Sequence, residues 1–279
     1  MKKVVIGIIG GTGQMGQFFK NFFEKNNCKV LIHSRKDKIK PSVFVKQCDI
    51  IIISVPIDVT IDVIRKIAPH INTNSLLIDT TSIKKAPVEA MLKYSSCEVI
   101  GMHPVFGPNV SSLKNQTIVL CPARANAWLK WVSNIFEKNE ARIKITTPEK
   151  HDEMMSVIQG LNHFCTLSAA HAMKNLDISI QEILEYTSPI YKLRMILLGR
   201  ILNQNPNLYA NIEMMNTKNE KALIAYTNSV KKLYKIIKTK DRREFLNYFN
   251  ECAKFFGDFK KEAENKSDYL IWQMVDIEK

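Results

Sequence analysis

Short apolar runs alternate with amphipathic segments through the first half of the chain. The runs are rich in Val and Ile and have a strand pattern at residues 4–9, 29–33, 50–54, 75–79, 98–102 and 117–121. The segments between them have helical spacing at residues 14–25, 59–67, 86–94 and 126–138. Nearly continuous apolar strands need helices on both faces, so the alternation predicts a doubly wound, mostly parallel (Rossmann-type) α/β sheet. A last strand at residues 142–146 is expected to complete it.

The pattern changes after Thr147. No later segment has a strand pattern, whereas helical spacing recurs at residues 148–173, 190–202, 218–238 and 241–266. Pro148 suits the first position of a helix, and the Thr147 hydroxyl can cap it. We therefore expect two domains, an α/β domain at residues 1–147 and an all-helical domain at residues 148–279.

The composition is that of an ordinary globular protein. Hydrophobic residues make up 46% and charged residues 24%, which excludes a disordered or collagen-like chain. No stretch approaches about eighteen consecutive apolar residues, so no membrane-spanning helix is predicted. The apolar run after Met1 ends in glycines without a cleavage pattern, which indicates a strand rather than a signal peptide. A cytoplasmic protein without a membrane partner is expected.

The chain is basic, with 40 Lys and Arg against 27 Asp and Glu and a formal net charge of +13. The basic residues form scattered pairs, such as Lys84-Lys85, rather than a tract interleaved with aromatic residues. This spacing favours a solvated surface over a nucleic-acid interface, so no nucleic-acid partner is expected. The six cysteines are widely spaced without a Cys-x-x-Cys pair, and the histidines fit no metal-ligand pattern. Neither a disulfide framework nor a metal site is expected.

The first strand leads into Gly11-Thr12-Gly13-Gln14-Met15-Gly16, which opens a helix. In such a G-x-G-x-x-G segment the glycines allow a tight turn and the close approach of a pyrophosphate, whose charge the helix N-terminus stabilises. Because both flanking elements are present, the segment indicates dinucleotide binding rather than a simple glycine turn.

The end of the second strand bears on the choice of dinucleotide. A carboxylate at this place binds the ribose hydroxyls of NAD, but here the strand ends in Ser34, Arg35 and Lys36, and Asp37 comes three residues beyond Ser34. A hydroxyl followed by cations suits the 2′-phosphate of NADP, with Arg35 able to make a forked contact. NADP is therefore the favoured cofactor, with NAD also possible. The alternative is a surface cationic pair.

Polar residues follow two of the later strands. His103 comes after residues 98–102 and directly before Pro104, which biases it towards extended backbone. Ligands bind at the carboxyl edge of open α/β sheets, and a histidine there can act as a general base near neutral pH. After residues 75–79, Ser82 could donate to a substrate hydroxyl and Lys84 could meet an anion. The alternatives are a structural histidine and a polar loop with a capping serine.

Arg200 lies among apolar residues of the segment 190–202. A helix this apolar is expected to be buried, and a buried guanidinium needs an anion. Lys192 lies roughly 80° round the helix and about 12 Å along it, so both cations could face one site. The alternative is an internal salt bridge. Gln159 and His163 share a helix face at i, i+4 and could line the same cleft.

Several motifs, in this order, resemble those of the prephenate dehydrogenase family. The most specific are His103-Pro104-Val105-Phe106-Gly107 and Ser188-Pro189-Ile190-Tyr191-Lys192. The others lie at residues 10–16, 54–57, 81–84, 158–164, 199–200, 208–210 and 256–258. The resemblance covers almost the whole chain and is greatest to the dehydrogenase portion of bifunctional chorismate mutase–prephenate dehydrogenases. Because the glycine segment begins at residue 10, neither mutase helices before it nor mutase activity is expected.

The resemblance implies oxidative decarboxylation of prephenate to 4-hydroxyphenylpyruvate, with hydride transfer to NAD(P), as a step towards tyrosine. It implies that His103 accepts the proton of the ring hydroxyl, that Arg200 binds a substrate carboxylate, and that Ser82 assists. The further residues expected at the substrate or cofactor are Lys84, Lys192, Gln159, His163, Ser54, Val55 and Pro56. The helical domain of this family builds a dimer, so a homodimer with a mostly apolar interface and a small dicarboxylate substrate is expected.

Other functions are compatible with part of the pattern. Lys192 and Asn162 stand where enteric relatives have arginine, which leaves open an amino-bearing substrate, arogenate or 4-amino-4-deoxyprephenate. A β-hydroxyacid dehydrogenase or imine reductase shares the broad fold but lacks the signature of Ser82 and His103-Pro104. A non-catalytic dinucleotide- or nucleic-acid-binding protein is favoured only by the net charge.

Overall fold

The computed structural model describes residues 3–277, which form two compact units. Unit 1 contains the described chain up to Ser156 together with Ala210–Lys218. Unit 2 contains Val157–Tyr209 and the described chain from Asn219 onward. The expected domain boundary at residues 147 and 148 lies at the start of a helix that belongs to unit 1.

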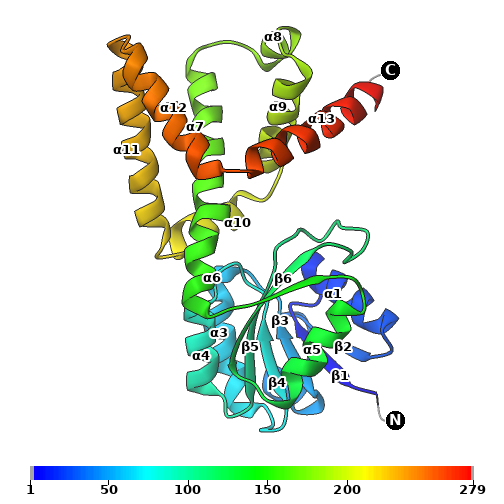
Figure 1. The fold of residues 1–279 in the computed structure, drawn as a ribbon. Coiled ribbons are helices and arrows are strands. Elements are labelled where there is room, and N and C mark those ends of the chain that lie inside the picture. The colour runs from blue at the N-terminus through cyan, green and yellow to red at the C-terminus, as the bar shows by residue number, and fades with distance from the viewer. Residues whose placement is uncertain (1–2, 278–279) are drawn as a thin grey trace. The chain divides into compact units, whose positions relative to one another are not determined.

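Unit 1 is built on a seven-stranded sheet (Figure 1). Its strands are β1 (Val5–Ile9), β2 (Lys29–His33), β3 (Ile50–Ile53), β4 (Leu76–Asp79), β5 (Glu98–Pro104), β6 (Thr117–Arg124) and β7 (Arg142–Ile145). They lie in the order β2-β1-β3-β4-β5-β6-β7, and every pair is parallel except β5 with β6. The predicted Rossmann-type architecture is confirmed. His103, expected just after its strand, lies within β5 near its carboxyl end.

Helices cover both faces of this sheet, which explains the continuous apolar strands. The main helices are α1 (Gln14–Lys25), α3 (Ile57–Ile67), α4 (Lys85–Tyr94) and α5 (Ala127–Glu137), with a short α2 at Pro41–Phe44 and 3₁₀ turns at Val45–Gln47 and Ala68–His70. Ile50 and Ile52 of β3 pack in one core with residues of α1 and α5. Ile51 and Ile53 pack in the other core with residues of α3 and α4. Alternate side chains of one strand therefore enter opposite cores.

The helix that begins at Pro148 is interrupted after two turns. It comprises α6 (Pro148–Met155), a π-helical segment at Ser156–Leu161 and α7 (Asn162–Asn175), where one helix to residue 173 was expected. As predicted, the Thr147 hydroxyl caps α6 by accepting a hydrogen bond from the backbone N–H of Lys150 at 3.2 Å. Unit 1 also includes the last part of α10 (Pro206–Met215), from which Ile212 packs with Ile57 and Ile83.

Unit 2 is helical. Besides α7, it contains α8 (Ile180–Glu185), α9 (Pro189–Leu202), α11 (Asn219–Lys238), α12 (Arg242–Phe256) and α13 (Phe259–Ile277). A single helix over residues 241–266 was expected, but Gly257, at φ +52°, ends α12 in a conformation that glycine adopts readily. Among the described residues, no helix is long and apolar enough to cross a membrane.

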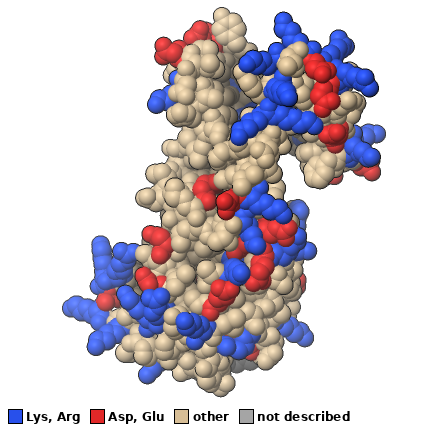
Figure 2. All heavy atoms as spheres, turned by 90° about the vertical axis from the view of Figure 1, so that its left-hand side faces the viewer, with Lys and Arg blue, Asp and Glu red and all other residues tan. Residues whose placement is uncertain are grey.

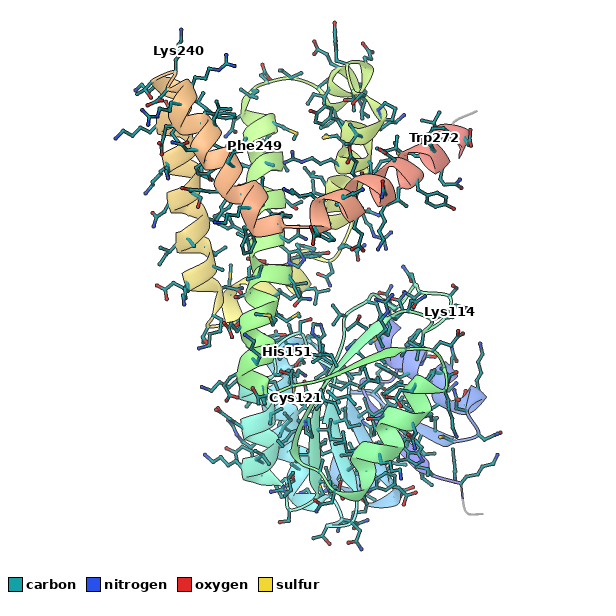
Figure 3. All side chains as sticks on the ribbon, in the orientation of Figure 1. Lys114, Cys121, His151, Lys240, Phe249 and Trp272 are labelled. Carbon is teal, nitrogen blue, oxygen red and sulfur yellow. The ribbon has the colours of Figure 1, made fainter. Side chains whose placement is uncertain are left out.

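The expectation that the helix containing Arg200 is buried is wrong for the single chain. In α9 only Leu198 is buried, whereas the side chains of Leu197 and Tyr191 are 55% and 64% exposed. Other helices of unit 2 also expose large apolar side chains, including Phe249 on α12 and Trp272 on α13 (Figure 3). The apolar character of α9 therefore produces uncovered surface here rather than a core.

Candidate active site

A glycine turn joins β1 to α1 at the carboxyl edge of the sheet. Gly10 has φ +80°, and a Cβ atom there would lie 2.2 Å from the carbonyl oxygen of Ser54. A Cβ atom on Gly16 would lie 2.5 Å from the carbonyl oxygen of Gly10. Because both approaches exclude larger residues, the glycines bring the start of α1 and the Ser54-Val55-Pro56 loop close to the turn. This cradle fits the pyrophosphate of a dinucleotide, with the N-terminus of α1 to stabilise its charge.

The loop after β2 brings the Asp37 carboxylate back to the end of the strand, although in the sequence Asp37 comes three residues after Ser34. The backbone N–H of Ser34 donates to the Asp37 carboxylate at 2.5 Å, and this bond is the main cause of the lowered pKa of Asp37. The backbone N–H of Gly10 donates to the carbonyl of His33 at 2.8 Å, which joins the end of β2 to the glycine turn. Arg35 and Asp37, both exposed, therefore provide opposite charges at the end of β2.

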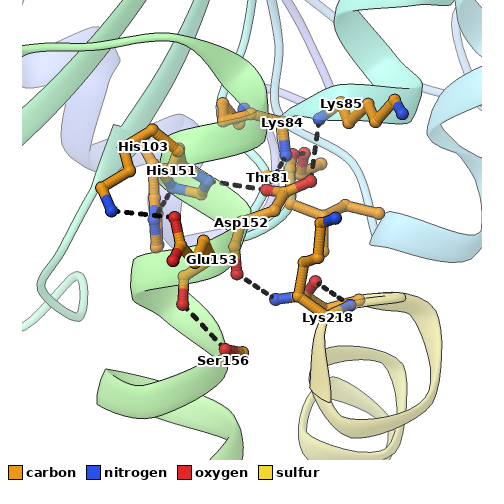
Figure 4. A network of polar contacts seen from close by, with 12 residues as sticks. Thr81, Lys84, Lys85, His103, His151, Asp152, Glu153, Ser156 and Lys218 are labelled. Atoms are coloured by element: carbon orange, nitrogen blue, oxygen red, sulfur yellow. Dashed lines mark hydrogen bonds and ion pairs between the residues drawn. The ribbon is translucent and has the colours of Figure 1, made fainter. Parts of the chain in front are cut away.

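His103 is the central side chain of the site, and it is 3% exposed. Its Nδ1 lies 2.8 Å from Nε2 of His151, a residue of α6. Nδ1 of His151 in turn lies 2.8 Å from Oδ1 of Asp152 (Figure 4). No described residue forms a hydrogen bond with Nε2 of His103. The side chains form a continuous chain of hydrogen bonds that leaves one nitrogen of His103 available.

Asp152 also joins α6 to the loop between β4 and α4. Its carboxylate accepts hydrogen bonds from the backbone N–H groups of Lys84 at 2.7 Å and Lys85 at 3.0 Å. The Asn216 side chain donates to the backbone carbonyl of Asp152 at 2.9 Å. These contacts fix the position of the carboxylate next to His151 (Figure 4).

Lys84 and Asp79 form a fully buried ion pair near the backbone of His103. The Lys84 ammonium also donates to the carbonyl of Met102 at 2.9 Å, one residue before His103. The Asp79 oxygen that faces Lys84 accepts bonds from the backbone and side chain of Thr81, whereas its other oxygen is buried without a partner in the described chain. The anion that Lys84 meets is thus Asp79, which ties the loop after β4 to the end of β5.

Burial keeps both histidines neutral. It lowers the pKa of His103 well below the usual 6.5, and the nearby charges of His151 and Lys84 act in the same direction. Burial also lowers the pKa of His151, although the hydrogen bond to Asp152 opposes that effect. A neutral imidazole with one available nitrogen can accept a proton, so the arrangement suits general-base chemistry.

Ser82 lies in the loop after β4, and it is half-buried with no hydrogen bond to a described residue. Since Asp79 of β4 pairs with Gly101 of β5, this loop and His103 follow the same edge of the sheet. The sequence predicted Ser82 and His103 as site residues but did not indicate His151 and Asp152, which hydrogen bonds join to His103. The sequence indicates only that His151 and Asp152 follow the helix start at Thr147-Pro148. It does not indicate that His151 contacts His103, which lies 48 positions earlier.

The other expected substrate residues, Arg200, Lys192, Gln159 and His163, belong to unit 2. The rings of His163 and Tyr209 meet edge to face at 4.7 Å. Burial raises the pKa of Tyr209, and the positive charge of Arg200 opposes that rise. Arg200 is exposed, and Gln159 lies in the π-helical segment with its Oε1 buried. Unit 2 thus has its own cluster of His163, Tyr209 and a nearby cation.

A Rossmann-type sheet with a glycine cradle, and a buried histidine at the same edge, are typical of dinucleotide-dependent dehydrogenases. In residues 3–277 no group of three His, Cys, Asp or Glu side chains could hold a metal ion.

Family comparisons agree with this class. The family model "Prephenate dehydrogenase, nucleotide-binding domain" matches residues 24–145, and "Prephenate dehydrogenase, dimerization domain" matches residues 147–251. A relative from Methanocaldococcus jannaschii, named probable arogenate/prephenate dehydrogenase, is 35% identical over 99% of this chain and 66% of its own length. The T-protein of Enterobacter agglomerans is 31% identical over 95% of this chain and 70% of its own length. The chain therefore belongs to the prephenate dehydrogenase family, and the predicted resemblance is confirmed. It spans about two thirds of the length of these relatives.

Solved structures show the same fold. Prephenate dehydrogenase from A. aeolicus, in complex with hydroxyphenyl propionate and NAD+, has a TM-score of 0.74 at 18% identity, covering 91% of this chain and 97% of that one. Synechocystis arogenate dehydrogenase has a TM-score of 0.69 at 20% identity, covering 93% of this chain and 100% of that one.

Proposed function

We propose that the chain catalyses oxidative decarboxylation of prephenate to 4-hydroxyphenylpyruvate, with His103 as the general base. The observation that carries this proposal is the buried, neutral His103 at the carboxyl end of β5, with Nε2 available. Nε2 accepts the proton of the ring hydroxyl while the same ring carbon loses hydride. The carbon–carboxylate bond then breaks, carbon dioxide leaves, and its electron pair completes the aromatic ring. The glycine cradle would hold a nicotinamide dinucleotide, which would supply the hydride acceptor.

For the substrate, we propose that Arg200 and Lys192 bind carboxylates and that Gln159 and His163 add hydrogen bonds. Their support is their chemistry and the motifs shared with the family. Ser82 donates to the substrate from the loop after β4. Lys84 acts on that loop through its buried bonds to Asp79 and Met102 rather than by touching substrate.

For the cofactor, we propose that the chain uses both dinucleotides, with their ratio set at the loop after β2. Arg35 favours the 2′-phosphate of NADP, whereas the Asp37 carboxylate opposes it and can accept from the ribose hydroxyls of NAD. The carboxylate at this loop offsets the preference for NADP that the sequence alone favours.

For assembly, we propose a homodimer formed through unit 2, in a cytoplasmic enzyme with no nucleic-acid partner. The match to a dimerization domain and the exposed apolar side chains of α9, α12 and α13 support the dimer. On the face shown in Figure 2, Lys and Arg side chains lie in several groups separated by acidic and uncharged surface, which supports a solvated surface there rather than a nucleic-acid interface.

Turnover of three substrates tests the assignment. Purified protein is assayed with prephenate, arogenate and 4-amino-4-deoxyprephenate, following nicotinamide reduction with each dinucleotide. We expect kcat/KM to be at least about tenfold higher for prephenate than for either amino-bearing substrate, a difference of about 1.4 kcal/mol in transition-state binding. A higher value for either amino-bearing substrate would assign the chain to that reaction instead.

A further inference from the structure

We propose that His151 and Asp152 form a proton relay behind His103, which fixes the tautomer of the base and shares the proton that it accepts. The catalytic part of this inference rests on the proposed function. The geometric part rests on the three side chains themselves, which lie within unit 1 in an unbroken chain of hydrogen bonds.

The direction of each hydrogen bond follows from Asp152. Its carboxylate accepts backbone N–H bonds from Lys84 and Lys85, and an ionised carboxylate can only accept. Nδ1 of His151 must therefore carry the proton in the bond to Asp152. In a neutral ring, Nε2 of His151 is then the acceptor, so Nδ1 of His103 must donate to it. This leaves Nε2 of His103 unprotonated, with its lone pair available for the substrate.

The same chain provides a path for charge when His103 acts. The substrate hydroxyl gives its proton to Nε2 of His103, and the Nδ1 proton of His103 moves to Nε2 of His151. The net result is one added proton, held as a His151 imidazolium that donates to the Asp152 carboxylate. Unlike a cation on His103, this cation lies directly beside a counter-charge. After product release the two transfers reverse and His103 loses its proton to solvent.

The charges around the relay favour this placement. Lys84 lowers the pKa of both histidines, so it opposes a positive charge on either. Asp152 and Asp79 raise the pKa of His151, but neither acts on His103 to a comparable degree. His151 is therefore the better place for the proton, and Asp152 is the group that makes it so.

The tautomers can be measured without any activity. In uniformly nitrogen-15-labelled protein at pH 7.5, NMR should show a protonated Nδ1 and an unprotonated Nε2 in both His103 and His151. Spectra of the His103→Asn and His151→Gln variants assign the signals. A protonated Nε2 in either ring would overturn the inference, and this result holds whatever substrate the enzyme uses.

Variants of the relay test its catalytic part. In Asp152→Asn the new amide can donate to Nδ1 of His151, which reverses both bonds and protonates Nε2 of His103. We expect kcat to fall about 100-fold or more, by analogy with the loss of tautomer control in catalytic triads. His151→Gln can still accept from His103 but cannot take its proton, so kcat should fall about tenfold. KM for prephenate should change by less than about threefold in both, because neither residue touches substrate.

Glu153→Gln is the matched control, because Glu153 is an exposed neighbour on α6, and its kcat should stay within about twofold of wild type. A kcat within about twofold of wild type for both relay variants would overturn the relay, as would equal losses in kcat for Asp152→Asn and Glu153→Gln. If wild type turned over none of the three substrates, the proposed function would fail and the NMR result alone would decide the inference.

Discussion

At the scale of single residues, the site depends on ionisable groups whose protonation is set by burial and by nearby charges. His103 and His151 are held neutral inside the protein, although they would take up protons near pH 6.5 in the unfolded chain. At the surface, the pKa of Asp37 is lowered by its bond to the backbone of Ser34, so that side chain stays anionic at neutral pH. In the function proposed above, the first effect prepares the base, and the second is expected to alter the choice of dinucleotide.

The two buried histidines predict how stability changes with pH. Because their folded pKa values are lowered, the unfolded chain binds more protons below about pH 6.5, so the stabilisation is complete above that pH and is lost as the pH falls. The urea midpoint should therefore fall between pH 7.5 and pH 5.5. In the His103→Asn/His151→Gln double variant the fall should be smaller. An equal fall in wild type and double variant would show that these histidines do not contribute.

Asp37 and Arg35 predict opposite changes in cofactor preference. Asp37→Asn removes the charge that repels the 2′-phosphate, so the ratio of kcat/KM for NADP to that for NAD should rise about tenfold. Arg35→Ala should lower the same ratio by a similar factor, because a forked contact is lost. Steady-state kinetics with both dinucleotides measure these ratios, and Lys38→Ala, a nearby surface variant, serves as the control. An unchanged ratio in both variants would show that this loop does not discriminate.

At the scale of elements, the site is assembled by contacts between the loop after β4, the end of β5 and α6. The Lys84–Asp79 pair joins the first two, and Asp152 joins the loop to α6. The apolar pattern predicts the strands because inner strands such as β3 supply alternate residues to two cores. It does not predict the interruption of the helix after α6, where a Cβ atom on Gly160 would lie 2.4 Å from the Asn219 side chain. That close approach depends on packing between segments far apart in sequence.

The residues of the candidate site also fall into those that the sequence could predict and those that depend on packing. His103 and Ser82 could be placed from the sequence because they lie at or just beyond the carboxyl ends of strands, and these ends share one edge of the sheet. The hydrogen bond between His103 and His151 could not be predicted from the sequence, because it depends on how α6 returns to the sheet after β7. Gly257 could have been recognised as the end of α12, since glycine is common at such positions. The carboxylate of Asp37 could not be placed from spacing alone, because the turn brings it back to Ser34.

The buried ion pair predicts a large difference between two adjacent lysines. Lys84→Met leaves Asp79 charged and buried without its counter-ion, which should lower the free energy of unfolding by about 3–5 kcal/mol. Lys85→Met keeps the backbone bond to Asp152 and changes only an exposed side chain, so it should cost less than about 0.5 kcal/mol. Urea unfolding of both variants measures the difference. Similar values for the two would contradict the structural role assigned to Lys84.

At the scale of the whole molecule, the exposed apolar helices of unit 2 indicate a missing partner surface. Phe255 is 87% exposed and Trp272 is 75% exposed, which is unusual for a protein that stays monomeric. Light scattering after size-exclusion chromatography should give about twice the chain mass of 32.0 kDa at micromolar concentration. The Phe255→Glu/Trp272→Glu variant should shift towards the monomer, whereas a monomeric wild type would contradict the proposed assembly.

The proposed mechanism depends on His103 as the base of a prephenate dehydrogenase. The most direct measurement is the initial rate of prephenate-dependent nicotinamide reduction by wild type and His103→Asn, with carbon dioxide release followed in parallel. Wild type should release one carbon dioxide for each dinucleotide reduced. The variant should still bind dinucleotide but lose about 10²–10⁴-fold in kcat. Reduction without carbon dioxide release would contradict the proposed decarboxylation, and a variant as fast as wild type would contradict the role of His103 as the base.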